Sequence, residues 1–452
     1  MNTPFRSAPL WWALTLALPA WAGPPDDALR AADPDTPVAT STLALPPAQR
    51  LDTPDGPADL AAARALWREA NQRVAEFPRG HIDLLRWEAA QADTRPAPAR
   101  AATATPLGVG EVLRASLRLR PGLFTHAGMN PLEQARVRIA YAEHVREVQH
   151  AWITAVAARE RARLRAAVLD ASRQGSELGR RMVRVGNWPA ARLMQEQAIE
   201  AAAWQASADA ELAARDAIER LAGLMGLWQA DAVSALADRL PPGLPALPER
   251  ADAGLPADGG VEAAVLRADP LLALEREPAR RAFAALPDGR WRAWDSARDA
   301  ALRALPEPGQ GPAMPPHIDQ LGLLRDARLQ EAEEQRARLL ARASERRAMA
   351  RSAWARLQAS HAFAQHAERH IAGLADAQQQ EGQLRYNGMF DSTWQLLASA
   401  RQRLDALDSA QQARAAWWRA QASWQALLAG APYQPDTAAP AAAAAQPDAG
   451  GH

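Results

Sequence analysis

Two short stretches decide the fold: VGNWP at residues 185–189 and YNGMF at residues 386–390. Each interrupts a long run of helix-forming residues, and their glycines, Gly186 and Gly388, stand 202 residues apart. Glycine suits such a place because it adopts a positive φ, which ends a helix without steric cost. We therefore interpret each stretch as a tight turn between two helices, and the chain as two tandem copies of one helical hairpin.

The sequence on both sides of the turns repeats in the same way. The pairs Ala151-Trp152 and Ala353-Trp354 show the 202-residue offset again, while the glycines that close the copies, Gly226 and Gly430, are 204 residues apart. The second copy therefore carries two extra residues. We expect the first hairpin repeat over residues 58–226, a linker over 227–258 and the second repeat over 259–430.

Apolar residues in these regions recur at mixed spacings of three and four, which is typical of antiparallel coiled-coil packing. The stripes that show it are Tyr141, Val145, Val148, Trp152 and Val156 in the first copy, and Leu397, Ala400, Leu404, Leu407, Trp417, Ala420, Trp424 and Leu427 in the second. No proline falls between Pro131 and Pro189. At ~1.5 Å per residue, this run predicts a helix roughly 80 Å long.

The two ends of the chain differ from its middle. Arg6, an apolar run over residues 10–18 and the small-x-small site Ala20-Trp21-Ala22 predict a secretory signal peptide over residues 1–22, with a retained anchor as the alternative. Residues 23–57 are expected to form an extended lead-in, and 431–452 a disordered tail. The mature protein is then exported, either to the outer membrane with a periplasmic helical part or to the soluble periplasm.

Composition argues against several kinds of function. The formal net charge is +0, which is not typical of nucleic-acid binding, and the absence of cysteine excludes disulfides and thiolate sites. His361, His366 and His370 lie near one another on a predicted helix, but we interpret them as solvated or packing residues rather than metal ligands. The sequence lacks a phosphate-binding loop and a catalytic constellation. We expect no enzyme, no cofactor and no metal site.

The turns resemble those of TolC-type outer-membrane efflux proteins. The stretch LRYNGMF, residues 384–390, followed by Leu396, Leu397 and Ala400, is similar to that family's tyrosine–glycine turn and its downstream leucine pair. The first copy, residues 184–187 followed by Leu193, is a looser match, and both closing segments resemble the leucine–glycine ends of the family's repeats. The resemblance covers roughly residues 58 to 430.

The resemblance implies a fold and a function. Three chains would form a hollow helical cylinder, an efflux subunit that serves as a passive export duct for metal ions or small toxic molecules. The turns would dock a periplasmic adaptor protein and, through it, an inner-membrane pump. The residues implied at the docking tips are Arg184, Val185, Gly186, Arg385, Tyr386, Asn387 and Gly388; the alternative is that they only end their helices.

The family places membrane strands before each long helix, at positions equivalent to residues 90–129 and 287–320 here. Alternation at Leu113, Ala115, Leu117 and Leu119 is compatible with a strand, but Val112, Ser116 and Leu119 fit a helix equally well. We therefore expect a mainly α fold of two long coiled-coil hairpins, with β-barrel strands that are short, degenerate or absent. The alternative function is a barrel-less periplasmic coiled-coil scaffold or binding protein derived from that family.

Overall fold

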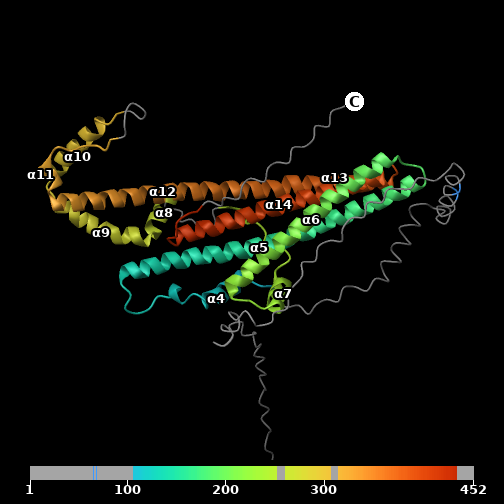
Figure 1. Cartoon of the computed structure of the whole chain (residues 1–452), viewed down its shortest axis with the longest axis horizontal. Coiled ribbons are helices and arrows are strands. Elements are labelled where there is room, and N and C mark those ends of the chain that lie inside the picture. The colour runs from blue at the N-terminus through green and yellow to red at the C-terminus, as the bar shows by residue number, and fades with distance from the viewer. Residues whose placement is uncertain (1–64, 66–67, 69–104, 252–259, 307–313, 435–452) are drawn as a thin grey trace, which may run out of the picture.

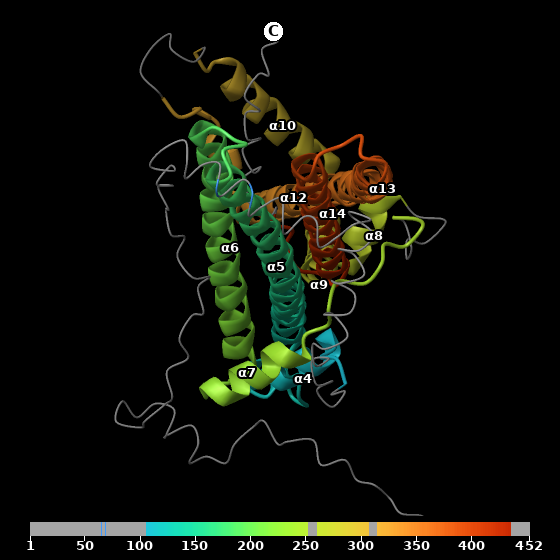
Figure 2. The same cartoon turned by 90° about the vertical axis from the view of Figure 1, so that its right-hand side faces the viewer.

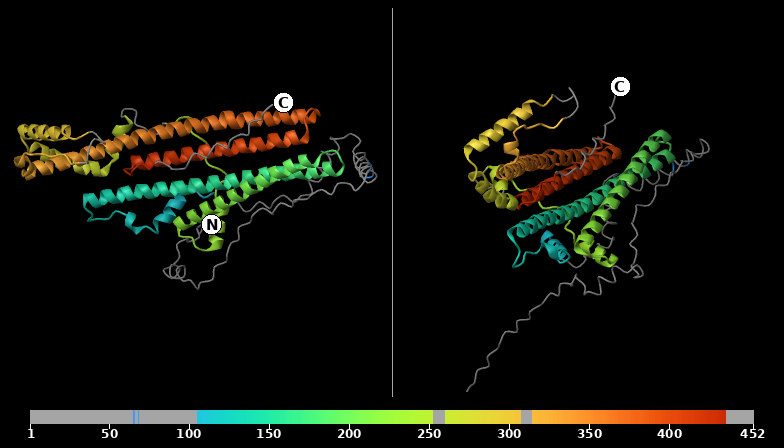
Figure 3. Two further views of the ribbon diagram at one scale, coloured as in Figure 1. Left: turned by 45° about the horizontal axis from the view of Figure 1, so that its top comes forward. Right: turned by 60° about the vertical axis from the view of Figure 1, so that its left-hand side comes forward.

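The computed structural model describes residues 65, 68, 105–251, 260–306 and 314–434, and within these ranges it is helical with no β-strand. Helix α5 (Pro131–Arg184) turns into α6 (Ala190–Met225). A second long helix runs through α12 (Ala327–His366), η2 (Ala367–Ala372) and α13 (Gly373–Asn387), and turns into α14 (Thr393–Leu428). The two hairpins lie side by side, with both turns at the same end of the molecule (Figures 1 and 3). The predicted fold class, a mainly α chain of two tandem hairpins, is confirmed.

Helix α5 begins where its sequence provides a start signal. Asn130 Oδ1 accepts a hydrogen bond from Glu133 N at 2.9 Å, and Glu133 Oε2 accepts one from Asn130 N at 2.9 Å. This reciprocal capping box satisfies backbone donors that a helix N-terminus leaves without partners, and Pro131 occupies the first helical position, which needs no donor. The expected long helix therefore starts at Pro131 and continues for 54 residues.

Short helices occupy both segments where strands were weighed. The described part of residues 90–129 contains α4 (Val109–Leu117) and η1 (Pro121–Leu123), and the described part of residues 287–320 contains α10 (Asp288–Arg303). In α4, Val112 and Ser116 are fully buried and lie one helical turn apart, so the helical pattern prevails over the strand-like alternation. The other short helices of the second repeat are α8 (Val261–Ala268), α9 (Pro270–Ala284) and α11 (Leu321–Leu324).

Residues 227–251 of the expected linker belong to the packed structure. It contains α7 (Ala230–Arg239), and Leu236, Leu240 and Leu244 are buried in one core with residues of α5 and α6. Arg159 of α5 donates to the carbonyl of Leu240 at 3.0 Å, which fixes the end of α7 against the hairpin. The segment therefore connects the repeats and also covers the base of the first one.

Helix α14 holds the two hairpins together. It packs against α12 and α13 of its own hairpin and along α5 of the first (Figure 2). Trp417, Trp424 and Leu427 of the predicted stripe are buried there, whereas Tyr141 of the α5 stripe is 40% exposed. Many of the other buried residues are alanines, which allow helices to approach closely but bury little area each.

Charged residues reinforce the contact between the hairpins. Asp408 of α14 is buried and pairs with Arg165 and, at 3.5 Å, with Arg161, both on α5. Arg401 of α14 lies 3.6 Å from Glu196 of α6. Because a buried charge is costly without a partner, these pairs favour one lateral register of α14 against the first hairpin.

The first four residues of the expected tail, 431–434, lie against the helical body. Ala431 is fully buried, and its carbonyl accepts from Arg346 at 2.8 Å. Arg146 donates to Pro432 O and to Gln434 Oε1, both at 3.1 Å. These contacts join the first residues of the predicted tail to α5 and α12, and an Ala-Pro composition does not reveal them.

The signal peptide (1–22), the lead-in (23–57) and residues 435–452 of the predicted tail lie outside the described residues. Among the helices that are described, none has a stretch long and apolar enough to cross a membrane.

Candidate docking surface at the two helical turns

The first turn ends α5 with a left-handed glycine. Gly186 has φ +75°, its N–H donates to Val183 O at 2.9 Å, and the N–H of Asn187 donates to Met182 O at 2.9 Å. This pair of bonds is a Schellman motif, in which the residue after the C-cap takes the left-handed conformation. The prediction that Gly186 ends its helix with a positive φ is confirmed.

The second turn has the same motif one residue later than predicted. Met389, with φ +63°, occupies the left-handed position, whereas Gly388 has φ −81°. Met389 N donates to Tyr386 O at 3.0 Å and Phe390 N to Arg385 O at 2.9 Å. The expectation that Gly388 supplies the positive φ was wrong. The residues in the left-handed conformation, Gly186 and Met389, are 203 residues apart, not 202.

A π-helical segment explains this shift. Before it, Ala151 and Ala353 are both buried and are 202 residues apart. Between Ala353 and the turn lies η2, a π-helix over Ala367–Ala372, and a π-bulge is the usual way in which a helix absorbs one additional residue. One of the two extra residues of the second copy is therefore located in η2, and it moves the turn forward by one position.

A tryptophan pair joins the two turns. Trp188, which is 9% exposed, lies with its ring centroid 4.0 Å from that of Trp394 in the first turn of α14. The guanidinium of Arg192 stacks over both rings, at 4.1 Å and 5.9 Å from their centroids. A Cβ on Gly179 would lie 3.4 Å from Trp188 Cζ3, so glycine lets the indole rest on α5. The turns thus form one continuous surface.

This pair was not predicted from the sequence. The signal was a tryptophan near each turn, Trp188 within the first turn stretch and Trp394 four residues after Phe390, because a large aromatic side chain near a turn usually packs against something. The two rings come from different hairpins, so their contact depends on how α14 packs against α5 and α6.

The second turn presents apolar side chains to solvent. Leu384, Met389 and Phe390 are 67%, 84% and 80% exposed. Arg385 forms a bidentate pair with Asp391, with donor–acceptor distances of 2.9 and 3.2 Å, and this pair spans the turn. Exposed apolar side chains next to a rigid charged pair are a composition that suits binding of another protein.

The residues predicted at the tips are brought together but differ in exposure. Arg184, Gly186, Arg385, Asn387 and Gly388 are exposed, whereas Val185 and Tyr386 are half-buried. The exposed apolar residues beside them, Met389 and Phe390, were part of the quoted motif but were not among the predicted docking residues.

The histidines weighed as metal ligands do not converge. His361 is buried, with Nε2 at 2.9 Å from Pro248 O and its ring against Trp417. His366 and His370 are exposed on the other side of that helix turn, with ring centroids 5.0 Å apart. In the part of the chain that the structure describes, no group of three His, Cys, Asp or Glu side chains is arranged to hold a metal ion.

Comparison by sequence finds neither a matching family model nor a matching curated protein. Comparison of the fold finds outer-membrane channels of the TolC-type family. The outer-membrane channel OprN is 18% identical over 72% of this chain and 73% of its own, with a TM-score of 0.45. VceC, an outer-membrane protein of Vibrio cholerae, is 14% identical over 83% of this chain and 97% of its own, with a TM-score of 0.44. The CmeC channel of Campylobacter jejuni is 13% identical over 72% and 69%, with a TM-score of 0.44.

Proposed function

We propose that this protein is an efflux subunit of the outer membrane, a passive export duct of a tripartite system for metal ions or small toxic molecules. The observation that carries the proposal is the pair of turns. Two tandem hairpins, whose turn sequences resemble those of TolC-type proteins, bring their ends together at one pole, where Leu384, Met389 and Phe390 are exposed. An exposed apolar surface of this kind is typical of a site where a second protein binds.

The proposed partner at this pole is a periplasmic adaptor protein, which links the duct to an inner-membrane pump. The Trp188–Trp394 contact keeps both turns in one surface, so that an adaptor would contact residues of both repeats at once. The motive force would come from the pump, and the chain would act as a homotrimer. The site residues are then Arg184 to Gly186 in the first turn and Arg385 to Gly388 in the second, together with Met389 and Phe390.

Site-specific photo-crosslinking in the native host tests the docking surface. A photoreactive phenylalanine analogue at Phe390 is expected to crosslink a periplasmic adaptor protein, identified by mass spectrometry. The control is the same analogue at Phe363, which is 67% exposed on α12 but roughly 35 Å from the turn at ~1.5 Å per residue. Equal capture of the adaptor at both positions, or no capture at Phe390, would contradict the proposal.

A second function, a periplasmic coiled-coil scaffold or binding protein, is favoured by one observation. The described parts of both segments that precede the long hairpins contain helices, α4 and α10, and no strand, where an outer-membrane subunit of this family has strands. A scaffold would have the same hairpins and turns as a duct, so the crosslinking experiment does not distinguish the two functions. The location of the protein in the cell distinguishes them.

A further inference from the structure

The two turns differ in chemical character, although they form one continuous surface. The second turn exposes the three apolar side chains described above. The first turn, residues 184–192, contains two exposed arginines, Arg184 and Arg192, and no acidic residue. Its aromatic side chain, Trp188, is buried and is not available to a partner. The joined surface is therefore apolar at one turn and cationic at the other.

The local charge balance shows where the cationic character resides. Residues 184–192 and 384–395 contain three arginines and one acidic residue, in a protein of formal net charge +0. Arg385 and Asp391 pair with each other across the second turn, so their opposite charges sum to zero. The remaining formal charge of +2 belongs to the two arginines of the first turn.

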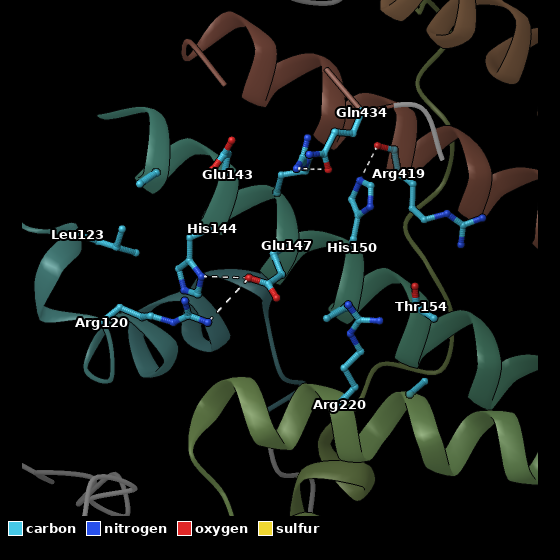
Figure 4. A pocket seen from close by; sticks show the side chains of 14 residues that line it. Arg120, Leu123, Glu143, His144, Glu147, His150, Thr154, Arg220, Arg419 and Gln434 are labelled. Atoms are coloured by element: carbon cyan, nitrogen blue, oxygen red, sulfur yellow. Dashed lines mark hydrogen bonds and ion pairs between the residues drawn. The ribbon is translucent and has the colours of Figure 1, made fainter. Parts of the chain in front are cut away.

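Arg184 has no ionic partner. It is exposed in the last turn of α5, where a helix favours a cation, and its side chain has no hydrogen bond or ion pair with another residue that the structure describes. Arginines between packed helices differ in this respect. At the hollow lined by residues of α5, α6 and α14, Arg120 lies 4.0 Å from Glu147 (Figure 4). Arg146 donates there to Gln434 Oε1 at 3.1 Å.

Arg192 is held in place and keeps its charge. Its guanidinium stacks over the ring of Trp188, 4.1 Å from the centroid. Such stacking uses the face of the guanidinium and leaves the N–H groups at its edge free to donate. Arg192 lies in the first turn of α6, where the helix dipole disfavours a cation. This turn has no acidic residue, and its N-cap, Pro189, donates or accepts no side-chain hydrogen bond, so the free N–H groups add to the positive potential.

We propose that the joined turns bind an acidic protein segment, which offers an apolar pocket to the second turn and carboxylates to Arg184 and Arg192 at the first. Guanidinium groups form charge-assisted hydrogen bonds with carboxylates, and an apolar centre with a polar edge is the usual composition of a protein–protein interface. Opposite charges also speed association of the partners. The proposal rests on the proposed docking function and specifies the chemistry of the partner.

A protein fits this surface better than a lipid bilayer does. The Arg385–Asp391 pair lies directly beside the exposed apolar side chains of the second turn. Insertion of these side chains into hydrocarbon would carry the ion pair with them, at a high desolvation cost. A protein surface can contact the apolar side chains and still provide hydrogen-bonding groups or water to the pair.

Site-specific photo-crosslinking at the first turn, in the native host, tests the proposal. A photoreactive phenylalanine analogue at Asn187, an exposed residue of that turn, is expected to capture the same protein as the analogue at Phe390. Mass spectrometry identifies the captured segment, which is expected to contain Asp or Glu. Arg184→Glu is expected to lower the crosslinking yield at Phe390 by about threefold or more, because it replaces an attraction with a repulsion.

The matched control is Arg356→Glu, an equal charge reversal at an exposed position of α12 away from the turns. Arg184→Gln should show a smaller loss than Arg184→Glu in the same direction, and immunoblotting of each variant verifies equal amounts of protein. Exchange of the captured carboxylate for lysine in the partner is expected to restore the yield with Arg184→Glu.

The outcomes separate this proposal from the docking function. Capture of an acidic segment, with a loss of yield for Arg184→Glu and none for Arg356→Glu, supports it. An unchanged yield with Arg184→Glu, or a captured segment that has basic residues and no acidic ones, would overturn the acidic partner and leave the docking function in place. Capture of lipid alone, or of nothing at either position, would overturn both.

Discussion

Replacing the two turn glycines with alanine should have unequal effects, although the two turns have similar sequences. Gly186 has φ +75°, a conformation that costs an L-residue about 1–2 kcal/mol. The alanine also restricts the unfolded chain, which returns about 0.4–1 kcal/mol. Gly186→Ala should therefore destabilise the end of α5 by about 1 kcal/mol.

Gly388→Ala should have an effect near zero. Gly388 has φ −81°, which alanine adopts without strain, and the same unfolded-state term is favourable. The added Cβ would meet Phe390 Cδ2 at 2.8 Å, but that ring is 80% exposed and can rotate away. The small cost of this rotation, up to about 1 kcal/mol, and the entropic gain offset each other.

Hydrogen–deuterium exchange measures the difference locally, at the backbone amides of the last turn of α5 and of α13. Gly186→Ala is expected to speed exchange at the first turn roughly fivefold, which corresponds to about 1 kcal/mol. Gly388→Ala is expected to leave exchange at the second turn nearly unchanged. If Gly388→Ala speeds exchange as much as Gly186→Ala does, then Gly388 rather than Met389 occupies the left-handed position and the 203-residue offset is wrong.

Three further predictions concern charged groups inside the helical body. Asp408→Ala should lower the free energy of unfolding in urea by about 3 kcal/mol, because it leaves the partly buried Arg165 without its main partner. The same change at Asp405, which is exposed, should cost less than about 1 kcal/mol. Burial raises the pKa of Glu160, so ionisation of this carboxyl destabilises the folded state as pH rises through that pKa. Glu160→Gln should therefore melt at a higher temperature than the parent protein at neutral pH. Below the ordinary pKa of 4.5 the carboxyl is protonated in both states, and the difference in melting temperature should disappear. Because the pKa of His144 is lowered in the folded state, the unfolded chain binds more protons than the folded chain below pH 6.5. Stability should therefore fall as pH drops through that value. His144→Gln should flatten this part of the pH profile of the melting temperature.

The hairpins could be predicted from the sequence because their signals are local. Asn130, Pro131 and Glu133 form a start signal within four residues, and a proline-free run of apolar residues at spacings of three and four indicates a long helix. Gly186 marks the first turn for an equally local reason. These features depend on the backbone and on neighbouring residues, so one sequence is sufficient to find them.

What the sequence did not reveal depends on contacts between distant segments or on a single inserted residue. The insertion absorbed by η2 leaves no mark in composition or in periodicity, so the position of Met389 could not be foreseen. Trp188 meets Trp394 only because α14 packs against the first hairpin. A helical region of 108–119 was one of two patterns that fit the same leucines, and the burial of Val112 and Ser116 decided between them.

Fractionation of cells that express the full-length protein, followed by a urea wash of the membranes, tests most directly whether this chain works as an export duct in the outer membrane. A duct is expected to remain in the outer-membrane fraction as a wash-resistant oligomer. Recovery of the protein in the soluble periplasmic fraction would contradict the duct and would favour the coiled-coil scaffold.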